Sequence, residues 1–452
     1  MTVAREMAEF ANRASWGALS PRAREALKLH VLDSLGCALA ARDDDLPVRV
    51  RAAVDEAGGA PKCTLIGGGR SSSDRAALYN TALVRYLDFN DAYLAPGETC
   101  HPSDSLPAVL AAAQVAGTDG QTLLASLAVA YQVQCRLSDE APLRARGFDH
   151  TTQGTCAMAA GVSRALSLDV ERTANAIAIA ATVSPALRVT RSGALSNWKG
   201  LASAHSAIMA THAVLLARGG VTGPPAAFEG VNGFMESVSG PFHVEWSRED
   251  LERVTATSLK RFNSEVHAQF AIEAVLELVS ENDIVPSEIE QIVVGVFGVA
   301  FDIIGGGLEG DKTRVQTKEQ ADHSLPYLVA VAALDRQVMP AQFERERIVR
   351  ADVQALLRQV VVRPDPALSG SFPREVPCEV TLLLKDGRRL ARQKRDYLGF
   401  RSRPLSWDEG DRKFRTLTAR IGPHRQAHLE ALVSNLERIP VEDLCSALEE
   451  KT

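Results

Sequence analysis

Residues able to move a proton are concentrated between positions 87 and 107. This stretch contains two carboxylates, Asp88 and Asp91, with Asn90 between them and His101 further along the chain. If Asp88 and Asp91 are helical, they lie on one face, one turn apart, where two like charges repel. Burial would then raise the pKa of at least one of them, which suits proton transfer. The alternative is a solvated loop that carries ordinary capping residues.

His101 stands directly before Pro102, and a proline disfavours helical backbone at the residue that precedes it. Pro102 itself suits the first position of a helix, and an apolar stripe begins at Leu106. We therefore expect the His101 imidazole to lie beside a helix N-terminus, a region that favours anions.

Three further polar patches each stand directly before a helical pattern. Their chemistry-bearing residues are His150 (patch 147–155), Lys199 (patch 197–200), and Lys260, His267 and Gln269 (patch 259–269). Because a cation is unfavourable at a helix N-terminus, Lys199 should have another reason for its position. Lysines together with histidines suit a substrate that bears carboxylates, although a single lysine is more often a surface charge.

Several other kinds of chemistry are disfavoured by the sequence. It contains no GxxxxGK[ST], HExxH or GxSxG motif, and Gly305–Gly310 fits GxGxxG but leads into Asp311–Arg314 rather than an apolar helix. The seven cysteines are scattered without a CxxC pair, which disfavours a disulfide framework, a zinc knuckle and a clustered iron–sulfur site. A net charge of −6 gives no indication of binding to nucleic acid or to an anionic membrane.

The elements that must position these residues are mainly helices. From Arg22 to about Ala217, apolar residues recur at three- and four-residue spacing, which is typical of packed helices. Short β-branched segments follow at 289–297, 360–364, 378–384 and 389–393, with helical patterns between them and again from Trp407. We predict a mainly α fold: an all-helical domain formed by residues 1–268 and 400–452, with a smaller α+β domain inserted at 269–399.

The N-terminus is charged and amphipathic, so we do not expect a secretory signal there. The longest apolar stretch, 200–217, contains two histidines and several hydroxyl side chains, which makes it poor membrane material. A soluble, cytoplasmic protein is the expectation.

Taken in order, the polar patches resemble the MmgE/PrpD superfamily, and in particular its 2-methylcitrate dehydratases. The similar segments are 87–91, 101–104, 147–155, 198–199, 227–230, 260–269, 319–327 and 404–408. The resemblance implies a large helical domain, an α+β domain that acts as a lid, and in general a homodimer. It also implies a reaction on small di- or tricarboxylates without a metal or an organic cofactor.

The resemblance further implies, by position, the catalytic residues Asp88, His101, His150, Lys199 and Lys260. The two lysines would hold substrate carboxylates and stabilise enolate-like charge, and an imidazole, with His101 as first choice, would move a proton. Asp88, together with Asp91, would orient that imidazole or act as the partner acid. The residues expected to bind substrate are Asn90, Asp91, His267 and Gln269.

Dehydration of 2-methylcitrate or a similar citrate-like acid is the leading hypothesis, and two others stay open on the same scaffold: decarboxylation of the cis-aconitate type and epimerisation. All three reactions pass through a carbanion or enolate beside a carboxylate. Many relatives, notably the decarboxylases, carry Thr where this chain has Ala92, which disfavours decarboxylation. A non-catalytic scaffold that binds carboxylates is the more remote alternative. Aconitase-type dehydration uses a cysteine-held iron–sulfur cluster, so the scattered cysteines leave His, Asp and Lys to carry the reaction.

Overall fold

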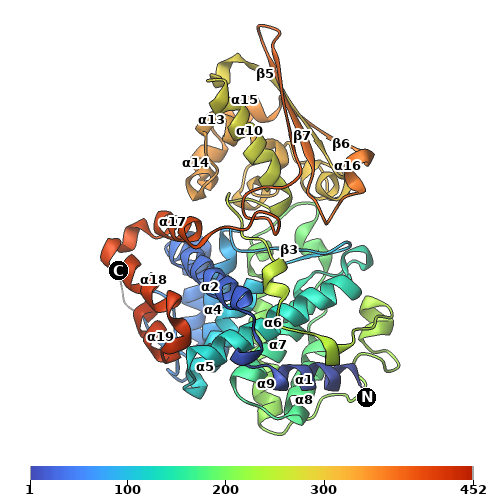
Figure 1. Ribbon diagram of the computed structural model, residues 1–452, viewed down its shortest axis with the longest axis vertical. Helices are drawn as coiled ribbons and strands as arrows, with labels where there is room; N and C mark the ends of the chain where they lie inside the picture. Colours follow the sequence, from blue (N-terminus) through green and yellow to red (C-terminus); the bar gives the residue numbers. More distant parts are fainter. Residues whose placement is uncertain (1, 450–452) are drawn as a thin grey trace. The chain divides into compact units, whose positions relative to one another are not determined.

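Helices dominate the computed structural model, which describes residues 2–449, and the prediction of a mainly α fold is confirmed (Figure 1). The chain divides into two units. Unit 1 comprises the chain up to Arg188, Gly200–Leu259 and the chain from Leu405 onward. Unit 2 comprises Val189–Lys199 and Lys260–Pro404.

Two segments that were predicted as part of the helical domain belong instead to unit 2. Residues 260–268 are tied to it by backbone hydrogen bonds, from Asn263 N to Val338 O (3.0 Å) and from Glu265 N to Asp322 O (3.0 Å). Residues 189–199 are tied to it by side chains, since Asn197 Nδ2 donates to Glu319 Oε1 at 2.7 Å. Neither connection leaves a periodic signal in the sequence.

The longer helices of unit 1 are α1 (Val3–Arg13), α2 (Pro21–Ala41), α3 (Asp45–Ala57), α4 (Ser73–Tyr86), α5 (Leu106–Ala116), α6 (Gly120–Glu140), α7 (Thr151–Ala165), α8 (Val170–Val183), α9 (Trp198–Arg218) from Gly200 onward, α17 (Trp407–Leu417), α18 (Pro423–Ser434) and α19 (Val441–Glu449). Helix α6 packs on α7, which packs on α8, and α17 returns to pack on α2. Close approach of α6 and α7 requires Gly161, because a Cβ there would lie 2.9 Å from Ser126 O and 3.0 Å from Ala130 Cβ.

A small hairpin, β3 (Tyr93–Leu94) with β4 (Thr99–Cys100), interrupts the helices of unit 1. It pairs Tyr93 with Cys100, and Asp91 and His101 therefore stand at its open end. A second small pair, β1 (Cys63–Thr64) with β2 (Arg70–Ser71), lies between α3 and α4 in the chain. The first hairpin positions the candidate site.

Unit 2 contains a four-stranded sheet in the order β6–β5–β7–β8. Its strands are β5 (Ile289–Val296), β6 (Val360–Pro364), β7 (Cys378–Leu384) and β8 (Arg389–Lys394), within two residues of the predicted segments. Strand β5 runs parallel to β6 and antiparallel to β7. Helix α10 (Gln269–Glu281) packs on β7 and β8, and α13 (Leu325–Asp335) packs on β6. The shorter helices are α11 (Gly298–Ala300), α12 (Lys318–Ala321), α14 (Arg345–Ile348), α15 (Ala351–Leu357) and α16 (Pro366–Ser369).

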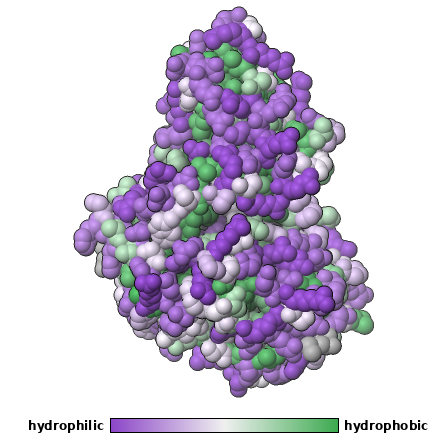
Figure 2. All heavy atoms as spheres, in the orientation of Figure 1, coloured by the Kyte–Doolittle hydropathy of each residue, from purple (hydrophilic) through white to green (hydrophobic). Residues whose placement is uncertain are grey.

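Helix α9 is long and apolar enough to cross a membrane by length and composition, but 61% of its apolar window is buried inside the protein. That burial is typical of a core helix in a globular protein. The face of the molecule seen in Figure 2 is largely hydrophilic, with hydrophobic residues scattered over it.

Candidate active site

The backbone that carries Asp88 is not helical, so the condition under which Asp88 and Asp91 would share a helix face is not met. Helix α4 ends at Tyr86, and Asp88 adopts the left-handed conformation with φ 56°. Arg85 Nη1 donates to Asp88 Oδ1 at 2.5 Å, which turns the carboxylate back toward the helix. Lys413 fixes the next residue by donating to Phe89 O at 2.8 Å while pairing with Asp33 at 2.6 Å. The segment is thus held in a specific, strained form.

The Asp91 carboxylate is a buried anchor. It accepts hydrogen bonds from His30 Nδ1 (3.0 Å) and Tyr131 Oη (2.7 Å) at one oxygen, and from Ser103 Oγ (2.7 Å) and Ser103 N (3.2 Å) at the other. Burial works to raise the pKa of Asp91, but the bonds from His30, Ser103 and Tyr131 outweigh it and lower this pKa below its usual range. The expected raised pKa is therefore not found at Asp91, and its carboxylate is occupied in holding the loop.

His101 is oriented by the backbone of Asp91. Its Nδ1 lies 2.6 Å from Asp91 O, and because a carbonyl oxygen can only accept, Nδ1 carries the hydrogen. The neutral ring then has its lone pair on Nε2, the form that takes up a proton. His101 precedes the 3-10 turn Pro102–Ser105 that leads into α5, which confirms its predicted place beside a helix N-terminus.

His150 lies next to His101, although the two are far apart in the sequence. The ring centroids are 5.2 Å apart and the planes meet at 70°. His150 Nδ1 is 3.5 Å from Asp149 Oδ1, an arrangement that stabilises positive charge on the ring. Asp149 is fixed in turn by Thr151 N at 3.1 Å and by Arg188 at 3.8 Å. Both histidines are buried, with 6% and 2% of their surface exposed.

The side-chain amide of Asn90 forms hydrogen bonds with neighbouring side chains of the protein. Its Nδ2 donates to Ser103 Oγ (2.9 Å) and to Asp104 Oδ1 (2.8 Å), and Asp104 Oδ2 accepts from Ser203 Oγ at 2.5 Å. Asn90 therefore joins the loop to the start of the next helix. A substrate contact of Asn90 stays a prediction.

Three residues of this network were not found by sequence reasoning. Arg85 could have been found, because it stands three residues before Asp88 and an i, i+3 pair of opposite charge is a helical signal. His30 and Tyr131 left no local signal. They reach Asp91 from α2 and α6, which only the tertiary structure brings to the same place.

In unit 2, Lys199 is paired with a buried carboxylate. Its Nζ lies 2.5 Å from Asp322 Oδ1, and the same carboxylate binds Lys318 Nζ at 3.1 Å and His323 Nδ1 at 2.9 Å. Burial opposes the charged form of Asp322, but the two ammonium groups and His323 hold its pKa well below the usual range. Asp322 explains why a lysine stands at the start of a helix, and sequence reasoning did not single it out.

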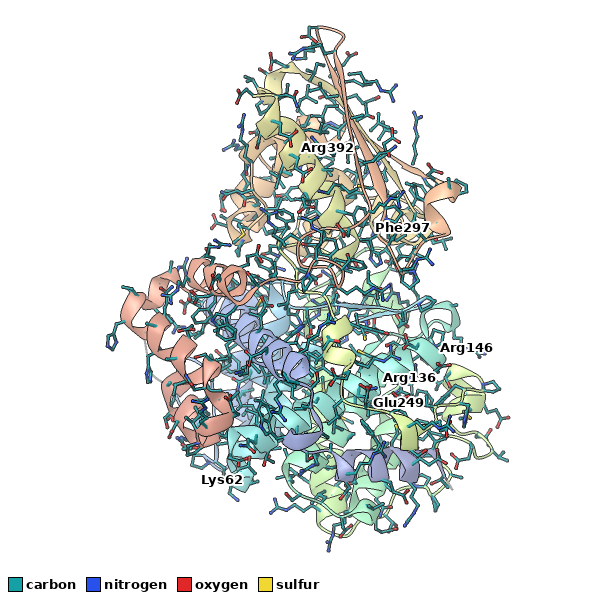
Figure 3. The ribbon with its side chains drawn as sticks, viewed as in Figure 1. Lys62, Arg136, Arg146, Glu249, Phe297 and Arg392 are labelled. Atoms are coloured by element: carbon teal, nitrogen blue, oxygen red, sulfur yellow. The ribbon has the colours of Figure 1, made fainter. Side chains whose placement is uncertain are left out.

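Lys260 is fully buried in unit 2, close enough to Glu265 to stabilise its charge. Glu265 accepts from His267 N at 2.6 Å and from His267 Nδ1 at 2.8 Å. Burial opposes ionisation of Glu265, but His267, His323 and Lys260 lower its pKa to about 2. Phe297, labelled in Figure 3, and Phe372 flank the His267 ring with centroids 5.8 Å and 5.9 Å away.

The two predicted substrate-binding residues of this segment, His267 and Gln269, differ in whether their side chains still have a hydrogen-bonding group available to a substrate. Within the described part of the chain, His267 Nε2 has no hydrogen-bond partner, which leaves it open to a ligand. Gln269 instead accepts from Arg261 N and Phe262 N, both at 3.0 Å, and donates to Phe262 O and Ser264 Oγ, both at 2.7 Å. A substrate contact by Gln269 would have to replace one of these bonds.

The sequence matches the description of the MmgE/PrpD N-terminal domain over residues 5–247 and that of the MmgE/PrpD C-terminal domain over residues 262–438. The chain belongs to the MmgE/PrpD family. The interval between the two matched domains contains the boundary between unit 1 and unit 2 at Leu259 and Lys260.

The names of relatives in this family describe more than one activity. The chain is 27% identical to the 2-methylcitrate dehydratase of Salmonella typhimurium over 447 residues, covering 91% of this chain and 90% of the relative. It is 28% identical to the 2-methylcitrate dehydratase of Cupriavidus necator over 451 residues, with the same coverage. It is also 25% identical to the cis-aconitate decarboxylase of Mus musculus over 397 residues, covering 82% and 77%. These names point to a lyase without fixing its substrate.

Proposed function

We propose that this MmgE/PrpD protein is a hydro-lyase that removes water from 2-methylcitrate or a similar citrate-like polycarboxylate. The observation that carries the proposal is the pair of buried imidazoles, in which the His101 tautomer is set by Asp91 O and the His150 ring lies at its edge. The relatives named 2-methylcitrate dehydratase, aligned over nearly the whole chain, support the choice of reaction.

The proposed chemistry begins at a carbon beside a carboxylate. His101 Nε2 takes the proton, and the electron pair of the broken C–H bond forms the C=C bond as the C–O bond to the hydroxyl breaks. The leaving hydroxyl needs a proton, and His150 beside the Asp149 carboxylate is the proposed donor. General acid–base groups of this kind typically contribute about 10²–10⁴-fold to the rate.

Two lysines are the proposed ligands of the substrate carboxylates. Lys199 and Lys260 are both buried, where a charge-assisted hydrogen bond to a carboxylate is stronger than in water. Such bonds would stabilise the enolate-like charge as it develops. The resemblance implies no metal or organic cofactor, so side chains of the protein perform each proposed step.

The decisive experiment offers the protein 2-methylcitrate, citrate and cis-aconitate separately. Absorbance of the unsaturated acid reports dehydration, and release of CO₂ reports decarboxylation. Dehydration of 2-methylcitrate or citrate without CO₂ is the expected result. Turnover of none of the three acids would contradict the proposal and favour a carboxylate-binding scaffold.

Decarboxylation is the second candidate, favoured by relatives named cis-aconitate decarboxylase in Mus musculus and Homo sapiens. In this reaction the C–C bond to CO₂ breaks, the negative charge left beside a carboxylate needs the same stabilisation, and a donor such as His150 protonates the carbon that lost CO₂. No leaving hydroxyl has to be protonated, and no proton has to be removed from carbon. The His101→Gln variant separates the two reactions. It should suppress dehydration strongly, because dehydration needs a base that removes a proton from carbon, and it should affect decarboxylation of cis-aconitate less, because decarboxylation removes no such proton.

The assembly and location of the enzyme are also proposals. A homodimer agrees with the resemblance, and a cytoplasmic location agrees with the seven scattered cysteines. The exposed apolar side chains of Leu215, Leu216 and Val221 at the end of α9 are typical of an interface. Sedimentation equilibrium should then give twice the mass of one chain. A monomer at micromolar concentration would contradict this part of the proposal.

A further inference from the structure

Glu98 is a buried carboxylate at the tip of the β3–β4 hairpin, and the mechanism above does not use it. Its side chain is only 3% exposed. Oε2 accepts from Leu143 N at 3.1 Å and from Arg144 N at 2.9 Å, and Oε1 accepts from Thr99 N at 3.1 Å. The carboxylate therefore fastens the hairpin tip to the connection that follows α6.

The backbone around Glu98 fits this contact closely. Ala95 N donates to Glu98 O at 2.9 Å and closes the turn. A Cβ added to Gly97 would lie 3.0 Å from Pro142 Cβ, so the tip rests directly against the connection. A larger residue at position 97 would push the two apart.

The two segments that Glu98 joins are the ones that carry the paired histidines. The hairpin ends at His101, whose ring is held by Asp91 O at the start of the same hairpin. The connection leads through a turn at Gly147 to His150, and Phe148 N donates back to Leu143 O at 3.3 Å. Displacement at the Glu98 contact would thus move one histidine relative to the other.

Burial of the charged Glu98 carboxylate is energetically unfavourable, as its pKa shows. Burial raises the pKa of Glu98 to about 7, and the Asp149 carboxylate also works in this direction, while Arg188 and the backbone N–H groups lower it. Arg144 and Arg146 lie on the same connection, but Arg146, labelled in Figure 3, is exposed. A glutamine of similar size would avoid the burial of charge, but only a carboxylate can accept at both oxygens, so the charge at position 98 serves the contact with Thr99 N, Leu143 N and Arg144 N.

We propose that Glu98 is a positioning residue of the reaction, which sets the relative placement of the His101 and His150 rings by fastening the hairpin tip to residues 142–144. The kinetic consequence of this role rests on the proposed function. The placement of the rings does not, because it can be measured without substrate.

The test compares Glu98→Ala with Glu140→Gln, a control in which an exposed carboxylate near the same connection is neutralised. Histidine ring signals are recorded by NMR on protein labelled at the histidine Cε1, with His101 and His150 assigned from His101→Gln and His150→Gln. Both signals should move in Glu98→Ala and stay at wild-type positions in Glu140→Gln. Unmoved signals in folded Glu98→Ala would overturn the proposal.

Kinetics supply the second readout. With the acid that the wild type dehydrates, kcat of Glu98→Ala should fall about tenfold or more while KM changes little, because misplaced groups slow the chemical step. Moved rings with an unchanged kcat would overturn the positioning role. If no acid is turned over, the proposed function fails, whereas the ring signals still decide what Glu98 does.

Glu98→Gln covers the case in which the alanine variant does not fold. Its side-chain oxygen can still accept one or two of the backbone hydrogen bonds. Its NH₂ group would point at a backbone N–H group, and two donors cannot form a hydrogen bond with each other. The same two histidine signals should move in the same direction by a smaller amount. Signals at wild-type positions in this variant would overturn the proposal.

Discussion

His101 is held by the backbone rather than the side chain of Asp91: its Nδ1 donates to Asp91 O at 2.6 Å, while the Asp91 carboxylate binds His30, Tyr131 and Ser103. Asp91 therefore fixes the tautomer of His101 without sharing a proton with it. A backbone carbonyl does not ionise, so the acceptor that orients His101 Nδ1 stays the same whether or not the Asp91 carboxylate is protonated.

Replacement of His101 should remove the proposed base. We expect kcat of His101→Ala to fall by about 10²–10⁴-fold with little change in KM, because proton transfer acts in the transition state. Steady-state kinetics with the acid that the wild type dehydrates are the measurement. His428→Ala removes an exposed histidine and should match the wild type. Full turnover by His101→Ala would exclude this role for the residue.

Asp91→Asn should destabilise the fold, since it removes a buried charge that four hydrogen bonds satisfy. The expected loss in free energy of unfolding at pH 7 is about 1.5–3 kcal/mol. Because the pKa of Asp91 is lowered in the folded state, its stabilisation is present above the ordinary value near 4 and is lost as pH falls. Urea unfolding at pH 7 and pH 3.5 should show a smaller difference from wild type at the lower pH. Asp55→Asn, at an exposed ion pair, should show little difference at either pH.

Glu98 should give the opposite dependence on pH. Its pKa is raised in the folded state, from 4.5 to about 7, so its favourable contribution is complete below about pH 4.5 and is lost as pH rises through 7. Between pH 5 and pH 8, wild type should lose on the order of 3 kcal/mol more free energy of unfolding than Glu98→Gln. Denaturant titrations of both proteins at each pH check this. Parallel curves would show that Glu98 does not titrate in this range.

Lys199 and Lys318 bind the same buried carboxylate, Asp322, and so form a matched pair of test positions. Each alanine variant leaves Asp322 with one lysine, so the two should lose similar stability. Only Lys199→Ala should also raise KM, by about 10–100-fold, as expected for loss of a charge-assisted bond of about 1.5–3 kcal/mol. An equal rise in KM for Lys318→Ala would indicate that both act only through Asp322.

Removal of metal ions should leave turnover unchanged, because the proposed steps use side chains alone. Dialysis against EDTA followed by assay under the same conditions is the measurement. The cysteines agree with this expectation: all seven are buried, and burial raises the pKa of Cys63 and of Cys156 to about 12, which disfavours the thiolate form that ligates metals. Loss of activity that added iron or zinc restores would contradict it.

The sequence by itself determined the local elements and the candidate residues. Periodicity marked the helices and the four strands of unit 2, and Pro102 placed His101 at a helix start, because these features depend on neighbours in the chain. Motif order identified the family through the same residues.

Only the tertiary structure decided how those residues are used. At Asp88, where the sequence leaves the choice between helix and loop open, the backbone adopts a left-handed loop conformation, held by the ion pair with Arg85 and by the hydrogen bond from Lys413 to Phe89 O. The contact of His101 with His150, the anchoring of Asp91 by His30, and the pairing of Lys199 with Asp322 join segments that are distant in the chain. Hydrogen bonds and charge pairs between distant segments leave no periodic trace in a single sequence, so their partners become visible only when the chain is folded.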